Sequence, residues 1–327
     1  MTRPGAQALP LIPTLRPKVQ IRNVQIQTHS RCNADCVFCP YSESEHYENP
    51  GAMPDELWEK VLRDLTPFAE GINRGKVCPY LMQEPLIDKS IFEKIEQIYG
   101  VFPQTCVEIS TNGAALTERV VARLIELFRG RRHELWVSHH GIDAETLEHI
   151  MKINYKQAHA NLINLLKTSE GQLRVKIRGA GESRDGKHRY FSREEYLDYW
   201  KQNFCEYGIN PRNIHIDAFT FHDRAGGLHR MDRDAYKLNI GKIRDIGPGH
   251  QPFHCQRIDE WIHIMHDGRI RICCMDYHGE VELPSLQDMT LVEYFESDAY
   301  RKLVGMVTGR EESPEDFICK RCVSPGG

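Results

Sequence analysis

Between residues 24 and 219 the sequence alternates between short apolar segments typical of β-strands and longer segments with one apolar face, typical of helices. The predicted strands are 24–28, 105–111, 134–138, 173–178 and 214–219. The predicted helices are 55–65, 90–99, 117–128, a helix capped by Asp143, 156–167 and 193–205, with Gly100 and Gly130 just past two of their ends. The alternation predicts parallel β-α-β units with about six strands before residue 220, too few for a closed eightfold barrel.

Three cysteines follow the first predicted strand with the spacing C-x₃-C-x₂-C: Cys32, Cys36 and Cys39. Three thiolates this close can hold three irons of a [4Fe–4S] cluster, and without a fourth nearby Cys one iron stays open to a small molecule. A structural zinc site is the alternative, because His29 and His46 lie nearby. A disulfide framework is disfavoured, since the number of cysteines, 11, is odd and no secretory apolar segment precedes the motif.

Four further cysteines are candidates for a second site. Cys319 and Cys322 form a C-x₂-C pair, Cys273 ends the second of two alternating segments, and Cys255 precedes the first. Asp267-Gly268 joins those segments, which predicts a β-hairpin with a type I′ turn. Folding of this hairpin is expected to bring the four thiols together. The residues alone fit a Cys₄ zinc site and an iron–sulfur site equally well.

The first motif resembles the signature of the radical S-adenosylmethionine (SAM) superfamily, and Phe38 stands where that family usually has an aromatic residue. The resemblance implies that the open iron binds SAM and that one electron cleaves SAM to a 5′-deoxyadenosyl radical. It also implies an α/β fold, a partial (β/α)6 TIM-like barrel with its site at the C-terminal ends of the strands. The second set resembles the Twitch module, a shortened SPASM domain that binds one auxiliary [4Fe–4S] cluster, here through Cys255, Cys273, Cys319 and Cys322.

Other residues resemble SAM contacts of the family. Gln83-Glu84-Pro85 stands where the family has Gly-Glu-Pro, and Glu84 can accept a hydrogen bond from the SAM ammonium group. Arg178 ends a predicted strand and is suited to pair with the SAM carboxylate. The alternative for each residue is a polar loop residue without a ligand. The implied contacts are Phe38, Gln83, Glu84, Ser110, Thr111, Asn112, Ser138, His139 and Arg178.

Two residues are candidates for the chemistry itself. Asp223-Arg224-Ala225-Gly226-Gly227 follows the last predicted strand and resembles the Asn-Arg-Gly/Ala-Gly segment of Twitch enzymes, where the Arg faces the substrate and assists deprotonation of a hydroxyl. An ordinary turn residue is the alternative for Arg224. Cys274 directly follows a candidate ligand, so the two side chains point to opposite sides and Cys274 is expected to face the barrel mouth. Its thiol is a candidate hydrogen-atom donor; a buried thiol or a substitute ligand for Cys273 is the alternative.

These features favour a radical SAM epimerase of a sugar or aminocyclitol in secondary-metabolite (antibiotic) biosynthesis, similar to aminoglycoside epimerases that use a cysteine for hydrogen return. A dehydrogenase, similar to the radical SAM aminocyclitol dehydrogenases known from butirosin biosynthesis, is the alternative and needs no thiol donor. A peptide-modifying SPASM enzyme is disfavoured, because many of those carry an N-terminal peptide-binding domain and two auxiliary clusters. A non-catalytic zinc module is the fourth hypothesis. A flavodoxin or ferredoxin is the expected electron donor.

Charge and composition set the remaining expectations. The net charge of −4 and pI near 6.5 give no reason to expect a nucleic-acid or membrane partner, and no apolar run approaches ~18 residues. Residues 1–18, with four prolines, are expected to form an irregular lead-in, 19–240 the barrel and 250–327 the auxiliary-cluster domain. A reduced cytoplasm is the expected location, because free thiols and iron–sulfur clusters survive there.

Overall fold

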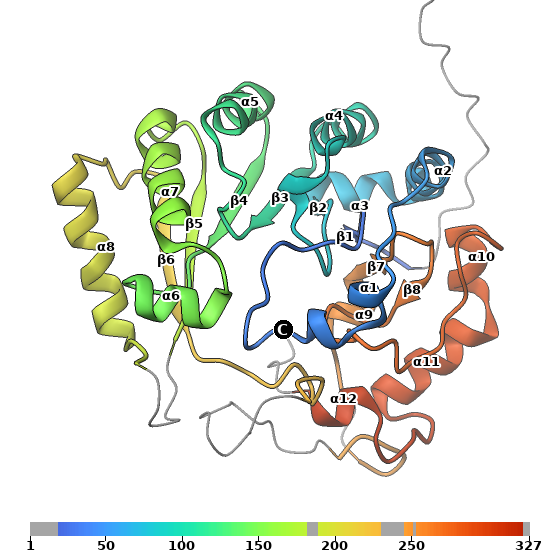
Figure 1. Cartoon of the computed structure of the whole chain (residues 1–327). Coiled ribbons are helices and arrows are strands. Elements are labelled where there is room, and N and C mark those ends of the chain that lie inside the picture. The colour runs from blue at the N-terminus through green and yellow to red at the C-terminus, as the bar shows by residue number, and fades with distance from the viewer. Residues whose placement is uncertain (1–18, 182–188, 230–244, 251–252, 323–327) are drawn as a thin grey trace, which may run out of the picture.

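The computed structural model describes residues 19–181, 189–229, 245–250 and 253–322. Within them the chain forms one curved sheet of eight strands in the order β6-β5-β4-β3-β2-β1-β7-β8. Helices α2, α4, α5, α7 and α8 lie along the outside of this sheet (Figure 1). The predicted fold class is confirmed: parallel β-α-β units form a partial barrel, and a C-terminal hairpin with helices follows it. The predicted lead-in and part of the predicted domain boundary lie outside the described residues.

The first six strands run parallel, each paired with the next in sequence. Their bounds are β1 (Asn23–Ile26), β2 (Lys76–Cys78), β3 (Cys106–Thr111), β4 (His133–Ser138), β5 (Val175–Ala180) and β6 (Ile214–Phe219). Strand β2 was not predicted as such, because three residues are too few to show an alternating pattern.

The described helices agree with the predicted ones to within a few residues, and several short ones are added. Before β6 they are α1 (Glu45–Glu48), α2 (Asp55–Leu65), α3 (Ala69–Arg74), α4 (Ile91–Val101), α5 (Glu118–Phe128), α6 (Ala144–Met151), α7 (Tyr155–Ser169) and α8 (Arg193–Tyr207). After β6 they are α9 (Gln256–Glu260), α10 (Leu291–Glu296), α11 (Asp298–Thr308) and α12 (Ile318–Arg321).

Helix ends follow local sequence in most cases. Asp143 caps α6 by accepting a hydrogen bond from the backbone N–H of Thr146 at 2.9 Å. Gly130 adopts a left-handed φ of 71° two residues after α5 ends. The prediction that Gly100 ends α4 is wrong, because the helix continues to Val101. The fully buried Phe102 extends the apolar stripe, and its N–H bonds to the carbonyl of Ile98 at 2.7 Å.

The C-terminal hairpin joins the barrel sheet. Strand β7 (Trp261–Ile264) pairs in parallel with β1, and β8 (Ile270–Arg271) pairs antiparallel with β7. The predicted type I′ turn is wrong: Gly268 has a φ of 80°, whereas Asp267 has no positive φ. The N–H of Gly268 bonds to the carbonyl of Met265 at 2.9 Å, and the N–H of Met265 to the carbonyl of Arg269 at 2.8 Å. The loop is therefore a three-residue turn with a left-handed glycine.

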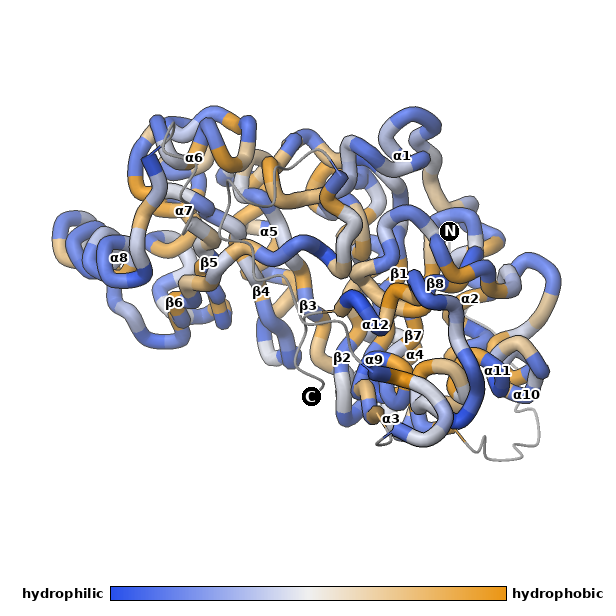
Figure 2. The backbone as a smooth tube through the Cα atoms, turned by 90° about the horizontal axis from the view of Figure 1, so that it is seen from below, coloured by the Kyte–Doolittle hydropathy of each residue, from blue (hydrophilic) through white to orange (hydrophobic). Residues whose placement is uncertain are grey.

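The two faces of the sheet differ in chemistry. Val107, Ile109, Leu135 and Val137 are buried under the outer helices, which themselves alternate between hydrophobic and hydrophilic residues (Figure 2). The intervening residues of the same strands, polar except for Cys106 and Trp136, face the concave side, which we call the lumen. Among the described helices, none combines the length and apolarity needed to cross a membrane.

Candidate functional site

The first cysteine loop leaves β1 at the C-terminal edge of the sheet. Cys32, Cys36 and Cys39 are all half-buried, and the N–H of Cys32 donates to the Tyr41 hydroxyl at 3.0 Å. Burial, the Glu84 carboxylate and neighbouring Cys39 raise the pKa of Cys32 to about 12. Burial together with the other two thiols also raises the pKa of Cys36. Three clustered thiols of this kind need a cationic partner to remain thiolates, which is what the irons of a cluster supply.

Two histidines near this loop, His29 and His46, are the candidate fourth ligands of the alternative zinc site. His29 accepts the N–H of Arg31 through Nδ1 at 3.0 Å, and its Nε2 lies 3.2 Å from the carbonyl of Glu84. The His46 ring packs edge-on against His266, with 5.4 Å between the ring centroids. Both nitrogens of His29 thus face backbone groups, whereas Nε2 of His46 has no hydrogen-bond partner among the described residues.

The second cysteine set converges in space. Cys255, Cys273, Cys319 and Cys322 line one cavity of about 150 Å³, which we call the auxiliary cavity. Cys274 and Arg257 line it as well. Among the groups around the Arg257 guanidinium are the thiols of Cys274, Cys273 and Cys255. No described carboxylate forms an ion pair with Arg257, so this cation faces the thiols.

Neither cysteine set is arranged for one small metal ion. Zinc binds sulfur at about 2.3 Å, so tetrahedral ligands lie within about 4 Å of one another. No three of the described Cys, His, Asp and Glu side chains are placed to hold a single metal ion. A four-iron cluster is larger than a zinc ion and holds its thiolates further apart.

The two sites lie at opposite ends of one strand pair. Trp261 of β7 is in register with Asn23 of β1, so Cys255 precedes β7 at the end of the sheet away from the first cysteine loop. The segment from Cys273 to Tyr277 then crosses back toward that loop. The Tyr277 hydroxyl lies 3.7 Å from the Sγ of Cys39.

Cys274 lies on this crossing segment. It packs against a cluster of Tyr41, Leu81, Met82, Met265 and Tyr277, and Cys32 and Cys39 pack against the same cluster. Because Cys274 also lines the auxiliary cavity, its thiol lies between the two cysteine sites. Tyr277 was not singled out from the sequence, where its closeness to Cys274 is the only signal.

Glu84 fastens the end of β3 to the loop after β2. Its side chain is 2% exposed and accepts hydrogen bonds from the Thr111 hydroxyl at 2.7 Å, the Asn112 N–H at 2.7 Å and the Leu86 N–H at 3.1 Å. Burial raises its pKa to about 7 despite these donors. Oε2 receives one of the three bonds, so it keeps acceptor capacity for a ligand cation.

Asn112 ties this region to the first cysteine loop. Its side-chain amide donates to Asn33 Oδ1 at 2.7 Å, between Cys32 and Cys36 in sequence. Gln83 donates to the Thr28 hydroxyl at 2.8 Å, whereas its buried Oε1 has no hydrogen-bond partner among the described residues. An unpaired buried amide oxygen here is suited to a ligand donor.

Phe38 closes the other side of the first cysteine loop. Its ring stacks on Phe221 at 4.7 Å and packs edge-on against His140 at 4.8 Å. Arg224 reaches the same ring, with 5.9 Å from its guanidinium carbon to the ring centroid, and its Nε lies 3.5 Å from the Phe38 carbonyl. Arg224 therefore lies at the mouth, beside the loop that carries the thiols.

The backbone at Arg224 is strained in a way typical of functional sites. Arg224 and Ala225 have φ values of 53° and 56°, and Gly226 follows at 83°. Hydrogen bonds from the N–H groups of Gly226 and Leu228 to the carbonyl of Asp223 hold this turn. This turn holds the Arg224 side chain over the Phe38 ring. The turn sequence alone does not predict such a conformation.

Polar residues from neighbouring strands meet in the lumen. The Trp136 ring lies between Lys176 and Arg178, at 4.6 and 4.7 Å from its centroid, and its Nε1 donates to Glu134 at 3.2 Å. Arg178 also lies 3.4 Å from the Asp217 carboxylate. Ser110 and Ser138 are half-exposed on the same face.

Of the residues expected at the SAM site, His139 lies on the outer side. Its ring is 1% exposed and packs against Trp200 at 5.2 Å and His159 at 5.7 Å, beneath α7 and α8. Burial lowers its pKa to about 3, so it stays neutral. Its neighbour Ser138 faces the lumen instead, because successive residues of a strand alternate.

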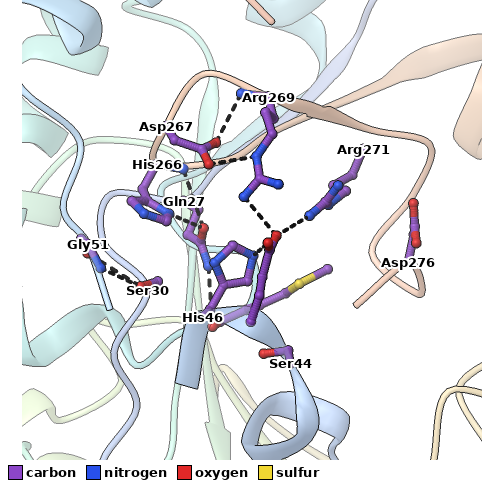
Figure 3. Close-up of polar contacts among 12 residues, drawn as sticks. Gln27, Ser30, Ser44, His46, Gly51, His266, Asp267, Arg269, Arg271 and Asp276 are labelled. Carbon is purple, nitrogen blue, oxygen red and sulfur yellow. Dashed lines mark hydrogen bonds and ion pairs between the residues drawn. The ribbon is translucent and has the colours of Figure 1, made fainter. Parts of the chain in front are cut away.

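Polar contacts fasten the hairpin to the segment after the first cysteine loop (Figure 3). Arg269 and Arg271 both donate to Glu45 Oε1, at 2.7 and 2.9 Å. Burial opposes ionisation of Glu45, but the hydrogen bond from Arg269 holds its pKa below the usual value. His266 donates through Nδ1 to Gln27 Oε1 at 2.9 Å. These contacts fix the two cysteine sites relative to each other.

Comparison with known families agrees with this geometry. The model of the radical SAM superfamily matches residues 26–172, which contain the first cysteine loop. The model of SPASM, an iron–sulfur cluster-binding domain, matches residues 255–323, which contain the second set. The chain carries a radical SAM domain and an SPASM domain. A radical SAM domain binds SAM and a [4Fe–4S] cluster, and an SPASM domain binds auxiliary iron–sulfur clusters.

Individual relatives of this chain are distant. An S-adenosyl-L-methionine-dependent 2-deoxy-scyllo-inosamine dehydrogenase of Niallia circulans is 28% identical over 104 residues, which are 32% of this chain and 40% of the dehydrogenase. The structure of BtrN in complex with AdoMet and 2-DOIA aligns with a TM-score of 0.56 at 14% identity, over 89% of this chain and 88% of BtrN.

A third similarity is to a peptide-bound protein. SuiB of Streptococcus suis, bound to its precursor peptide SuiA, aligns with a TM-score of 0.63 at 14% identity, over 94% of this chain and 72% of SuiB. At such identities the structural matches establish the shared fold and leave the substrate open.

Proposed function

We propose that the protein is a radical SAM epimerase that inverts a hydroxyl-bearing carbon of a sugar or aminocyclitol in secondary-metabolite biosynthesis. The observation that carries this proposal is the place of Cys274. Its thiol lies on the segment that joins the auxiliary cavity to Cys39 and packs against the side chains that surround the first cysteine loop.

In this proposal Cys32, Cys36 and Cys39 hold the SAM-binding cluster, and Cys255, Cys273, Cys319 and Cys322 hold one auxiliary cluster. When bound, the cluster and SAM would supply the radical chemistry that removes a hydrogen atom from the carbinol carbon. Cys274 then gives the hydrogen of its S–H bond to the opposite face of that carbon. A new C–H bond forms and a thiyl remains. One electron from a flavodoxin- or ferredoxin-type carrier and one proton from water restore the thiol.

The remaining residues bind and orient. Glu84 accepts from the SAM ammonium group through its free Oε2 capacity, and the orphaned Oε1 of Gln83 accepts beside it. Asn112 positions the first cysteine loop through Asn33. Ser110, Ser138 and Arg178 line the lumen below. Phe38 and Arg224 lie at the mouth of the barrel. There the Arg224 guanidinium assists deprotonation of a substrate hydroxyl by stabilising the negative charge that develops on its oxygen.

A dehydrogenase that oxidises a secondary alcohol of a similar substrate is the second candidate. Two observations favour it: the name of the Niallia circulans relative, and the Arg257 cation that faces the auxiliary thiols. A cation beside an iron–sulfur cluster favours its reduced form and so favours electron uptake from a substrate radical. The substrate is a small molecule in both cases, and a reducing cytoplasm suits both.

The test is the Cys274→Ala variant, with Cys205→Ala on the exposed face of α8 as its matched control. We expect Cys274→Ala to form 5′-deoxyadenosine with substrate present while the inverted product is lost. The control should match the wild type in both measurements. Unchanged formation of the inverted product by Cys274→Ala would remove this thiol from the mechanism, whereas an oxidised product from both wild type and variant would favour the dehydrogenase.

A further inference from the structure

The N-terminal edge of the sheet, opposite the first cysteine loop, carries a concentration of cations. Five of them line a groove of about 450 Å³, which we call the basic groove: Arg22, Arg74, Lys76, Arg132 and Arg174. Each stands at or just before the start of a strand, so the parallel topology gathers them at one edge.

The basic groove keeps a positive balance. Two carboxylates line it, Glu134 and Glu260, so its balance is five minus two, or +3, in a chain of net charge −4. Two carboxylates outside the lining also pair with its cations, Glu70 with Arg74 at 3.1 Å and Glu108 with Lys76 at 2.7 Å, and counting them leaves +1. Among the described residues no carboxylate lies within ion-pair distance of Arg132 or Arg174. Both residues are exposed, and Nη1 of Arg132 donates to the carbonyls of Asn73 and Gln104, so Arg174 and the rest of the Arg132 guanidinium face a potential anionic partner.

The basic groove adjoins the auxiliary cavity. Gln256, the first residue of α9, lines both, and it directly follows the candidate ligand Cys255. Glu260 and Trp261, at the other end of this short helix, also line the groove. One turn of helix thus separates the exposed cations from the thiols.

We propose that the basic groove is the docking surface of an acidic one-electron carrier protein, which exchanges electrons with the auxiliary site across α9. The carrier gives up one electron per encounter and leaves oxidised by one electron. SAM cleavage consumes one such electron. Charge complementarity favours an acidic protein here, and the adjoining cysteine cavity favours a redox protein over a nucleic acid. The proposal holds whether the enzyme is an epimerase or a dehydrogenase.

The experiment compares two reductants in one assay, the formation of 5′-deoxyadenosine by the reconstituted enzyme without substrate. An acidic flavodoxin with its reductase drives one arm and dithionite drives the other. The test variant is Arg22→Glu with Arg174→Glu, which changes the groove charge by −4. Among the described residues neither side chain donates a hydrogen bond, and Arg22 makes one ion pair, with Glu260 at 3.7 Å. Arg132, in contrast, donates to the carbonyls of Asn73 and Gln104. The control reverses two exposed arginines on outer helices, Arg119 and Arg193.

We expect flavodoxin-driven turnover of the test variant to fall at least about tenfold at low ionic strength, with the deficit shrinking at high salt. Dithionite-driven turnover should stay within about twofold of wild type, and the control should match wild type in both arms. Binding of oxidised flavodoxin, measured directly, should weaken in parallel. The proposal would be overturned if the test variant matched the wild-type enzyme in flavodoxin-driven 5′-deoxyadenosine formation or in its affinity for flavodoxin. An equal loss in the control, or tighter binding of nucleic acid than of flavodoxin by the wild type, would also overturn it.

Discussion

Glu84 gives a pH-dependent prediction for SAM binding. Burial raises the pKa of this carboxyl to about 7, although three protein donors face it. An ammonium group at Oε2 stabilises the carboxylate form, so SAM binding requires Glu84 to be deprotonated and lowers its pKa in the complex. As pH falls through 7, the free protein takes up a proton that SAM must displace. SAM affinity therefore decreases toward low pH.

The magnitude follows from the pKa. With a value of about 7, the ionised fraction of Glu84 is about 0.9 at pH 8 and about 0.1 at pH 6, so its contribution to the association constant changes about tenfold, or about 1.4 kcal/mol. The SAM amino group titrates in the same range. Titration of the SAM amino group affects the wild type and the Glu84→Gln variant alike. It therefore cancels in the ratio of their association constants, which reports on Glu84 alone.

The assay is anaerobic titration calorimetry of SAM into the oxidised, cluster-loaded protein, which does not cleave SAM. At pH 8 the variant should bind roughly 10- to 100-fold more weakly, the loss of a charge-assisted hydrogen bond of about 1.5–3 kcal/mol. The wild-type to variant ratio should fall about tenfold between pH 8 and pH 6. A ratio that stays constant with pH would refute the reasoning and leave Glu84 as a tie between β3 and its neighbouring loop.

Three further predictions concern cluster and fold. Alanine at any one cysteine of the first loop should abolish 5′-deoxyadenosine formation, whereas Cys106→Ala should retain it; cleavage by any loop variant would count against the cluster assignment. Tyr277→Phe removes the hydroxyl near the Sγ of Cys39 and should lower the midpoint potential of that cluster in an EPR-monitored redox titration, and an unchanged potential would show that this contact is immaterial. Gly279→Ala should destabilise the protein by at least about 1–2 kcal/mol in chemical denaturation, because φ is 68° and the new methyl group would overlap the Arg271 guanidinium. Gly100→Ala, with nothing nearby and inside α4, should instead stabilise it by about 0.5–1 kcal/mol; equal effects would contradict this account.

Local patterns were sufficient to predict most of the barrel. The apolar stripe of α2 and the capping residue Asp143 are readable from neighbours a few positions away, and the structure has both elements where they were expected. Strand β2 is not predictable in this way, because its three residues are too few to show an alternating pattern. The predicted end of α4 at Gly100 is wrong, because the burial of Phe102, a tertiary effect, outweighs the helix-ending preference of glycine.

The long-range arrangement was not readable from the sequence. Pairing of β7 with β1 joins segments more than two hundred residues apart, and no local signal distinguishes it from a separate hairpin. The same pairing places the two cysteine sets at opposite ends of one strand pair. It also brings Tyr277 against Cys39 and Arg257 against the auxiliary thiols. These contacts depend on how the sheet curves, which spacing motifs do not encode.

The proposed epimerase differs from a dehydrogenase in returning hydrogen from a thiol of this chain to a substrate carbon. The mass of the product distinguishes the two, with the anaerobic holoenzyme, SAM, a reductant and a panel of aminoglycosides and oligosaccharides in D₂O. An epimerase that uses Cys274 yields a product heavier by about one mass unit, with deuterium on carbon, because the Cys274 S–H exchanges with solvent before it quenches the radical. A product lighter by about two mass units would mean net oxidation. That result would contradict the epimerase assignment and establish the dehydrogenase.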